Sequence, residues 1–415
     1  MASCDGSDGV NLNQNGVIEN AKTYKISFEV LNYVGGFLNG RIGSANSNDF
    51  TVNSNGSYSF NVLSDGTNLI FRSSSFNGSI SNISVQEIQV NTPRIDFSDS
   101  ADGALLLEPQ RTNAMRYSSD FSQWSLKWNV TINSNVGLAP DGTLSADRIV
   151  FNGATNARVE DTAQGIDAFS YTNDRPISVW LKSESGTTTV QFGSSSSYLL
   201  TVTVTEEWQR FTHISKQGFA RIRSDNATSV LAWGYQFETN GDVSLSYPTS
   251  YIPTQGSAST RIAETCNNSG SAQDFNSEEG VLYAEISALA NDGTFRGISI
   301  SDGTNNNRIA LLFSNNSNII RVQVLSNNSL DVLIDKPITT TQSNKFAFSY
   351  NQNNFKFWIN GIKVGTDTSG NTPIDLNSLQ FNSGSGGSLF YGNVKSVQVF
   401  TTALSDEELQ KLTTI

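Results

Sequence analysis

The sequence predicts an all-β protein of three tandem antiparallel β-sandwiches of the jelly-roll type, followed by a short C-terminal helix. Charged residues make up only 15% of the 415 residues and hydrophobic residues 37%. The remainder is mostly Ser, Thr, Asn and Gly, which suits short strands with one wet face and tight turns. The 24 Phe, 12 Tyr and 6 Trp supply core material and argue against disorder. At about 100–200 residues per domain, this length predicts two to four domains.

The charge balance restricts the classes of partner. With a formal net charge of −12 and no run of Lys or Arg, nucleic acid and anionic membranes are disfavoured. No apolar stretch approaches 18 residues, so no membrane span is expected. The first residues lack a secretory signal, and we expect a chain that reaches its destination without one, or a fragment. Cys4 and Cys266 imply no disulfide framework, and His213 is expected to be a structural strand residue.

Residues 1–91 are predicted to form the first sandwich. Tyr24, Ile26, Phe28 and Val30 alternate with polar residues and should share one buried face of a strand. The dipeptides Asn39-Gly40 and Asn55-Gly56 predict turns. Further strands are expected over residues 57–62, 68–72 and 77–88.

Two segments of this unit have a resemblance to a known group. Residues 21–30 (Ala-Lys-Thr-Tyr-Lys-Ile-Ser-Phe-Glu-Val) and 76–87 (Phe-Asn-Gly-Ser-Ile-Ser-Asn-Ile-Ser-Val-Gln-Glu) resemble the β-sandwich modules grouped with family 4/9 carbohydrate-binding modules. The resemblance implies a jelly roll whose closing strand returns beside a first strand. Almost nothing precedes Cys4 to supply that strand, so we expect a truncated natural protein or a strand donated by another chain.

Residues 92–115 are predicted to be a connector. Its apolar residues 105–107 (Leu-Leu-Leu) form a short buried strand that Pro109 stops. Asp96, Asp99 and Asp102 recur every three residues. A solvated turn is the favoured interpretation, and a Ca²⁺ site is the alternative.

The polar end of the connector holds two charged residues, Glu108 and Arg111. In isolation they could be catalytic. We expect them instead to form a structural junction that ties the connector to the sandwich it enters.

Residues 116–265 are predicted to form the second sandwich, because short alternating segments recur between turns. The turn signal is residues 139–143 (Ala-Pro-Asp-Gly-Thr). Strands are expected over residues 128–132, 176–182, 188–192, 199–205, 207–212 and 230–238.

The flanks of this unit are more specific. Residues 106–113 (Leu-Leu-Glu-Pro-Gln-Arg-Thr-Asn), 117–124 (Tyr-Ser-Ser-Asp-Phe-Ser-Gln-Trp), 235–238 (Tyr-Gln-Phe-Glu), 248–254 (Pro-Thr-Ser-Tyr-Ile-Pro-Thr) and Thr260-Arg261 look like a module typical of tailed-phage and prophage virion proteins.

Residues 266–415 are predicted to form the third sandwich. Strands are expected over residues 280–286, 308–313, 319–324, 345–350, 354–364 and 392–400. Ser405 and Glu408 have the spacing of a capping box, which predicts a helix to about Leu412. Residues 357–361 (Phe-Trp-Ile-Asn-Gly), 392–400 (Gly-Asn-Val-Lys-Ser-Val-Gln-Val-Phe) and 403–409 (Ala-Leu-Ser-Asp-Glu-Glu-Leu) resemble the laminin-G/concanavalin-A-like jelly roll. That fold hosts lectins, enzymes and inert spacers alike.

The sequence offers no compact pair of carboxylates for glycoside hydrolysis. Glu279 and Glu285 flank an apolar strand, and Glu206-Glu207 is a turn. We therefore expect no enzyme and no cofactor, with Ca²⁺ as the alternative stated above. Sugar binding would need exposed aromatic side chains. Trp124 and Trp128 are the candidate exposed pair, because four-residue spacing places them on one face of a strand. Trp180, Trp208 and Trp233 are expected in the core.

The leading functional hypothesis is a non-enzymatic virion structural or adhesion protein, a fibre, spike or decoration protein on a phage particle. Its expected partners are host-surface glycan and other virion proteins. Such proteins are commonly symmetric multimers, with a trimer as one option, although no heptads enforce it. One alternative is a polysaccharide-active enzyme or its carbohydrate-binding portion. The other is a bacterial adhesin, located outside the cell or on its surface.

Overall fold

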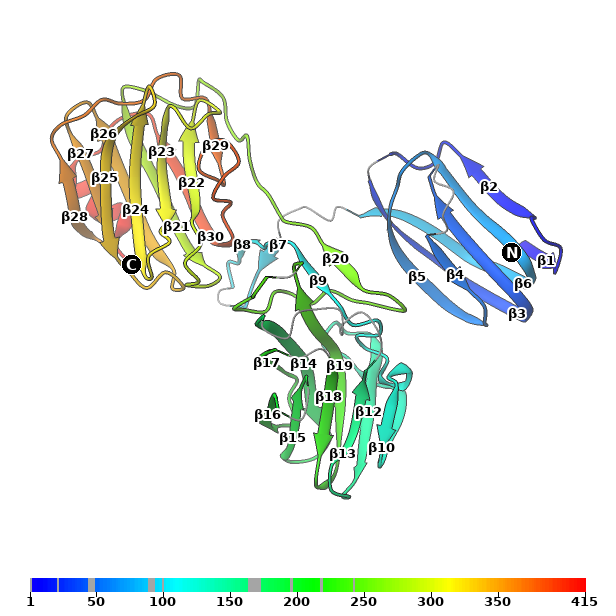
Figure 1. The fold of residues 1–415 in the computed structure, drawn as a ribbon. Coiled ribbons are helices and arrows are strands. Elements are labelled where there is room, and N and C mark those ends of the chain that lie inside the picture. Colours follow the sequence, from blue (N-terminus) through cyan, green and yellow to red (C-terminus); the bar gives the residue numbers. More distant parts are fainter. Residues whose placement is uncertain are drawn as a thin grey trace. The chain divides into compact units, whose positions relative to one another are not determined.

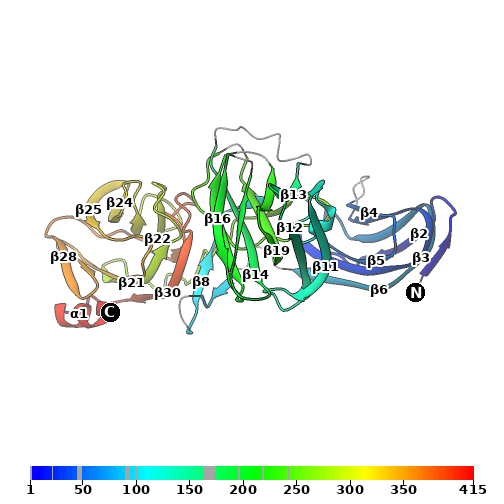
Figure 2. The same ribbon diagram turned by 90° about the horizontal axis from the view of Figure 1, so that it is seen from below.

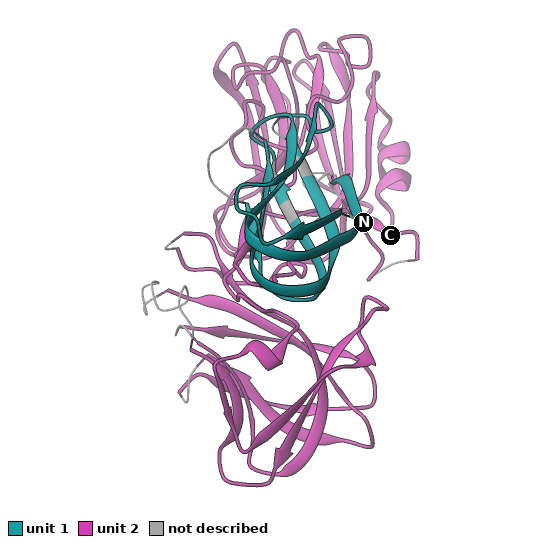
Figure 3. Ribbon diagram, turned by 90° about the vertical axis from the view of Figure 1, so that its right-hand side faces the viewer, with its two compact units in different colours: residues 1–90 teal, residues 91–415 magenta. Residues whose placement is uncertain are grey.

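The computed structural model of the chain describes residues 2–20, 22–43, 49–88, 94–98, 101–162, 173–194, 197–216, 219–241 and 243–415. Within these residues every regular element is a strand, apart from the 3₁₀ turn η1 (Phe121–Gln123) and the helix α1 (Asp406–Thr413) (Figures 1 and 2). This confirms the all-β prediction. The described part of the chain contains no helix long and apolar enough to span a membrane. Two compact units divide the chain, Met1–Val90 and Asn91–Ile415 (Figure 3).

The first unit is built on two very long strands, β3 (Thr23–Ile42) and β6 (Asn68–Ile88). They pair with each other over most of their length, and the shorter strands join them on either side. Tyr24, Ile26, Phe28 and Val30 all lie in the core, as the alternation predicts. The shorter strands are β1 (Ala2–Asp5), β2 (Asn11–Asn15), β4 (Phe50–Val52) and β5 (Gly56–Leu63).

The prediction of a turn at Asn39-Gly40 was wrong, because both residues lie inside β3. Gly40 is needed there for packing: a Cβ would come within 1.8 Å of the Phe50 ring. Likewise, the predicted strands 68–72 and 77–88 form one strand, β6. Ser75 and Asn82 take positive φ angles within it, so the strand continues through local irregularities.

The middle sandwich of the second unit consists of two sheets over one core. The five-stranded sheet has the order β10-β13-β18-β15-β16, and the opposite sheet follows the path β11-β12-β19-β14-β17. The turn at residues 139–143 is confirmed by backbone hydrogen bonds between Ala139 and Thr143 and between Gly142 and Ala139. The strands are β10 (Leu126–Trp128), β11 (Val130–Leu138), β12 (Leu144–Asn152), β13 (Ala157–Asp161), β14 (Arg175–Ser183), β15 (Thr188–Gly193), β16 (Leu199–Val204), β17 (Gln209–Ser215), β18 (Ala220–Ser224) and β19 (Ala227–Thr239).

The C-terminal sandwich also has two sheets, with the orders β28-β27-β26-β21-β30-β8-β7 and β25-β24-β23-β22-β29. The predicted strand over residues 354–364 is two strands, because Asn360 and Gly361 take positive φ angles and turn the chain. The capping box at Ser405 and Glu408 is confirmed at the start of α1. The strands are β21 (Glu279–Ala288), β22 (Arg296–Ser301), β23 (Arg308–Phe313), β24 (Ile319–Ser326), β25 (Ser329–Pro337), β26 (Asn344–Asn351), β27 (Phe355–Ile359), β28 (Ile362–Asp367), β29 (Ser378–Gln380) and β30 (Gly392–Phe400).

The predicted connector contributes strands of its own. β7 (Arg94–Asp96) and β8 (Ala104–Leu107) form an antiparallel pair, and β8 pairs with β30 of the C-terminal sandwich. Leu107 lies opposite Gly392 and is fully buried in the C-terminal core. The middle sandwich is therefore inserted in the chain between two neighbouring parts of one sheet.

β9 (Arg111–Asn113) and β20 (Ser259–Arg261) mark the two ends of this insertion. They pair with each other, and β9 also pairs with the end of β19. The chain thus enters and leaves the middle sandwich along adjacent strands.

The insertion makes a testable prediction about Leu107. Leu107→Ala removes a fully buried side chain from the C-terminal core and should lower the free energy of unfolding by about 2–5 kcal/mol. Denaturant unfolding measures this loss of stability. Hydrogen exchange should show that backbone amides of β30, far along the chain from the substitution, lose protection.

Leu330→Ala is the matched control, because Leu330 in β25 is 52% exposed and its truncation opens no cavity. A loss of protection confined to the middle sandwich in Leu107→Ala would contradict the assignment of β8 to the C-terminal sheet.

Candidate functional site

A row of side chains crosses the outer face of the five-stranded sheet. The residues lie directly opposite one another in register, and each belongs to a different strand. From β10 to β16 the row consists of Trp128, Arg158, Arg223, Gln191 and Thr201. Their neighbours along the strands, such as Val159 and Ile222, lie in the core, so strand alternation directs the row outward. We call these five residues the Trp128 row.

Trp128 gives this row an accessible aromatic face, since its side chain is 54% exposed. Gln191 donates a hydrogen bond from Nε2 to Oγ1 of Thr201 at 3.0 Å, which links the two strands at the far end. At a strand spacing of about 4.8 Å, the row extends over roughly 19 Å. It therefore offers one exposed aromatic ring and several hydrogen-bonding groups along one sheet face, on which the side chains of Arg158 and Arg223 are each 19% exposed.

Arginines dominate the charge of this face. Glu160 accepts from Arg221 at 2.6 Å and from Arg158 at 3.3 Å. Arg223 donates from Nη2 to both carboxylate oxygens of Asp225, at 2.8 and 2.7 Å. Nε of Arg223 is buried and has no hydrogen-bond partner among the described residues. Three guanidinium groups thus face two carboxylates.

The structure contradicts the prediction that Trp124 is exposed. It is only 1% exposed and its ring packs edge-on against Tyr235, with centroids 5.1 Å apart. Its Nε1 donates to the carbonyl of Tyr117. Trp124 ends the 3₁₀ turn η1 rather than sharing a strand with Trp128, so the four-residue spacing does not place the two rings on one face.

A sequence signal for η1 was present. Asp120 caps the turn by accepting a hydrogen bond from the backbone N–H of Ser122, a role for which Asp is favoured. Asp147 supports the same turn by accepting from the N–H of Phe121 at 2.8 Å. Burial raises the pKa of Asp147 to about 6.

The remaining tryptophans pack within the protein. Trp233 is buried in a small cluster with the partly buried Trp180 and Trp208. Trp358 is buried beneath α1 beside Leu409. These positions agree with the expectation of packing roles, and Trp128 is left as the exposed large aromatic ring among the six tryptophans.

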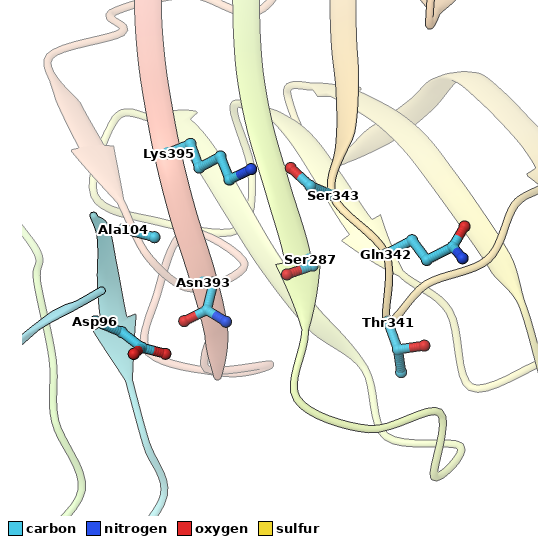
Figure 4. A pocket seen from close by; sticks show the side chains of 8 residues that line it. All are labelled: Asp96, Ala104, Ser287, Thr341, Gln342, Ser343, Asn393 and Lys395. Atoms are coloured by element: carbon cyan, nitrogen blue, oxygen red, sulfur yellow. The ribbon is translucent and has the colours of Figure 1, made fainter. Parts of the chain in front are cut away.

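The C-terminal sandwich carries a polar pocket of about 280 Å³ where β7 and β8 extend its sheet (Figure 4). Lys395 lies 3.9 Å from Glu285 and is thereby partly neutralised. Oδ1 of Asn393 is buried without a hydrogen-bond partner among the described residues. No aromatic ring lines the pocket, whose walls are formed by Asp96, Ala104, Ser287, Thr341, Gln342, Ser343, Asn393 and Lys395.

The three aspartates predicted as an alternative Ca²⁺ site are only partly described. Asp96 lines the pocket and accepts a hydrogen bond from the N–H of Ser98. Asp102 lies in an exposed turn, and Asp99 lies outside the described residues. Among the residues that the structure describes, no three His, Cys, Asp or Glu side chains gather closely enough to hold a metal ion. The Ca²⁺ site therefore stays a prediction.

Glu108 lies at the point where the chain enters the middle sandwich. It forms ion pairs with Arg94 and, at 2.9 Å, with Arg261. Its backbone N–H donates to the Glu264 carboxylate at 2.8 Å, and its carbonyl accepts from the N–H of Glu264 at 2.9 Å. Arg94 also donates to Glu264. Entry and exit of the insertion are thus fastened to each other.

Arg111 lies deeper in the same junction. It is 3.5 Å from the carboxylate of Glu238, which is fully buried, and 5.3 Å from the centre of the Tyr247 ring. Glu238 accepts from both the N–H and the hydroxyl of Thr249 and from Gln236. Burial raises the pKa of Glu238, while these hydrogen bonds and the charge of Arg111 oppose the shift.

Comparison with known proteins gives a family match for part of the chain. Residues 268–410 match the family described as the concanavalin A-like lectin/glucanases superfamily, in its laminin G group. These residues form a laminin-G/concanavalin-A-like jelly roll, as their motifs predicted. A search of curated proteins finds no match.

The solved structures that are similar include carbohydrate-binding and laminin modules. The CBM40 module of the Ruminococcus gnavus IT-sialidase is 18% identical, with a TM-score of 0.31, covering 36% of this chain and 94% of that one. A structure of that module bound to α2,3-sialyllactose is 19% identical, with a TM-score of 0.31, covering 36% and 94%. Domains LG4-5 of the mouse laminin α1 chain are 8% identical, with a TM-score of 0.25, covering 68% and 96%.

The junction makes a prediction about Arg111. Arg111→Ala removes the counter-charge of a fully buried carboxylate, and breaking such a pair is expected to cost about 3–5 kcal/mol. Denaturant unfolding of the purified chain measures this cost. Arg321→Ala serves as the control, since Arg321 pairs with Asp335 at the surface, where ion pairs contribute little. Equal unfolding midpoints for Arg111→Ala and the wild-type chain would contradict the structural role.

Proposed function

We propose that this chain is a non-enzymatic adhesion and structural protein that binds saccharide through the Trp128 row. In this proposal it is a fibre, spike or decoration protein at the surface of a tailed-phage particle or a related one. Its partners there are host-surface glycan and other virion proteins, and such proteins commonly assemble as symmetric multimers. No cofactor enters the proposal.

The observation that carries saccharide binding is the exposed ring of Trp128 beside a line of hydrogen-bonding side chains. A pyranose ring has one relatively apolar face, which packs on a flat aromatic ring, and a rim of hydroxyl groups, which need donors and acceptors. Arg158, Arg223, Gln191 and Thr201 supply those groups next to Trp128. The pocket at Asp96 has polar walls but offers no ring for stacking.

The non-enzymatic part of the proposal is supported by how the candidate carboxylates are used. Glu279 accepts a hydrogen bond from the N–H of Ala403 at 3.1 Å. Glu285 accepts from Ser343 and pairs with Lys395, and Glu206 accepts from the N–H of Gly186. Each therefore already fastens a loop or strand of its own sandwich.

The virion setting is supported by the sequence motifs on both flanks of the middle sandwich. They include residues 106–113 and 248–254, which the structure brings together: Ser250 donates its N–H to Glu108 at 2.9 Å, and the carbonyl of Ile252 accepts from Asn113. The motifs thus belong to one folded junction rather than to scattered loops.

Saccharide binding makes a prediction about Trp128. Trp128→Ala should weaken the binding of the full chain to its best ligand on a glycan array about fivefold, because an aromatic contact contributes about 1 kcal/mol. Unfolding stability should stay close to that of the wild type, since the ring is more than half exposed.

Leu144→Ala is the matched control: Leu144 is a similarly exposed apolar residue on the opposite sheet of the same sandwich. Equal loss of binding in both variants, or none in either, would contradict a role for the Trp128 row.

The virion setting makes a separate prediction. Mass spectrometry and antibody labelling of purified particles from the producing host should place the protein on the particle surface. Recovery of the protein only as free chains in the culture medium, and never with particles, would overturn the virion role and leave saccharide binding unaffected.

A further inference from the structure

We infer that the Trp128 row takes a saccharide that carries a carboxylate, with the carboxylate bound by Arg158 and Arg223. This inference rests on the proposed saccharide binding of the same row and specifies its chemical class. It follows from the charge of the face, from the opposition of two arginines in register, and from guanidinium N–H groups that have no partner in the described part of the chain.

The charge of this face departs from that of the chain. The chain carries a formal net charge of −12, yet among the described residues of this face Arg158, Arg221 and Arg223 pair with just two carboxylates, Glu160 and Asp225. Glu160 is bound more closely by Arg221 than by Arg158, at 2.6 against 3.3 Å. Arg158 is therefore the least neutralised of the three guanidinium groups.

Arg158 and Arg223 lie directly opposite each other on β13 and β18. Side chains in such a pair have Cβ atoms about 4.5–5.5 Å apart, and like charges in this position are destabilising. An anion placed between the two guanidinium groups converts this repulsion into attraction. A carboxylate suits them well because its two oxygens match the paired N–H groups of a guanidinium.

The hydrogen bonds of the two arginines leave donors for such a ligand. Arg158 uses Nε toward Glu160 and Nη1 toward the carbonyl of Asn156. Arg223 directs Nη2 at Asp225, and its Nε is buried and so is not available to a ligand. Nη2 of Arg158 and Nη1 of Arg223 make no hydrogen bond within the described part of the chain.

The order of the row orients the ligand. Trp128 at the edge of the sheet stacks on one sugar ring, and the arginine pair on the next two strands holds the carboxylate. Gln191 and Thr201 then face the hydroxyl groups of a further ring. Because the row crosses all five strands of the sheet, it fits an oligosaccharide better than a single sugar.

Single-stranded nucleic acid is the competing ligand that pairs aromatic stacking with arginine. Its binding sites combine several stacking rings with cations repeated along the phosphate backbone. This row has one exposed ring, and on its sheet face Glu160 and Asp225 offset two of the three positive charges of Arg158, Arg221 and Arg223. The remaining charge matches an occasional carboxylate on a saccharide rather than a phosphate at every unit.

The test compares each acid with a matched neutral saccharide, using the full chain and isothermal titration calorimetry. The probes are tetragalacturonate and its methyl ester, then 3′-sialyllactose and lactose, so that uronic and sialic acids are separated as sources of the carboxylate. We expect at least one acid to bind about tenfold more tightly than its neutral partner, as hydrogen bonds to a charged group imply. Raising the salt concentration should weaken only the acid.

Arg158→Gln and Arg223→Gln should each reduce the affinity for the acid about tenfold and leave that for the neutral partner within about twofold. Arg321→Gln, at a surface ion pair on another sheet, should change neither. The salt dependence of the wild-type chain keeps the inference testable even where a variant fails to fold.

Equal affinity for acid and neutral partner, with no salt dependence, overturns the inference while saccharide binding stands. If a 15-nucleotide deoxythymidine strand binds more tightly than every acidic saccharide, the row is a nucleic-acid site and the inference is overturned as well. Absence of binding to every saccharide, neutral or acidic, defeats the proposed function together with the inference.

Discussion

The backbone of Glu108 exchanges hydrogen bonds with Glu264 in both directions: its N–H donates to the carboxylate and its carbonyl accepts from the N–H. These two residues stand at the start and the end of the inserted middle sandwich. Holding the ends of so long a segment together removes much of the conformational freedom that the insertion would otherwise have. The β8 pairing with β30 depends on this closure, because the chain must leave the C-terminal sheet and return to it at nearby points.

The two sheets of the middle sandwich differ in how they connect to this closure. The sheet with β19 is continuous with the junction, since β9 pairs with both β19 and β20. The five-stranded sheet pairs with none of the described junction strands. Its outer face therefore keeps a row of polar side chains and an exposed tryptophan, and a binding role can be placed there without disturbing the contacts that hold the insertion in place.

Local sequence signals made much of the fold predictable. Alternation along one strand predicted the buried face from Tyr24 to Val30, and the capping box at Ser405 predicted the start of the helix. The pairing between distant strands was not predictable in the same way. The three leucines at residues 105–107 predict a buried strand, but they do not indicate that its pairing partner is β30. The Trp128 row has the same origin: each member is an ordinary outward residue of its own strand, and only the register across five strands aligns them. The prediction that Trp124 is exposed was wrong for a local reason: Asp120 caps a 3₁₀ turn that ends at Trp124, before β10 begins.

The two arginine clusters of the second unit differ in how their charges are arranged. At the junction the buried carboxylates are all paired with arginines. Arg94 pairs with both Glu108 and Glu264, Arg261 also pairs with Glu108, and Arg111 pairs with Glu238. Burying these carboxylates is tolerable because they are paired and hydrogen-bonded. On the five-stranded sheet, by contrast, two arginines oppose each other directly across neighbouring strands. A fold has no need for that opposition, which lowers stability. In the inferred binding an external carboxylate completes this opposition, so that affinity for the ligand would come from the same charges that lower the stability of the free protein.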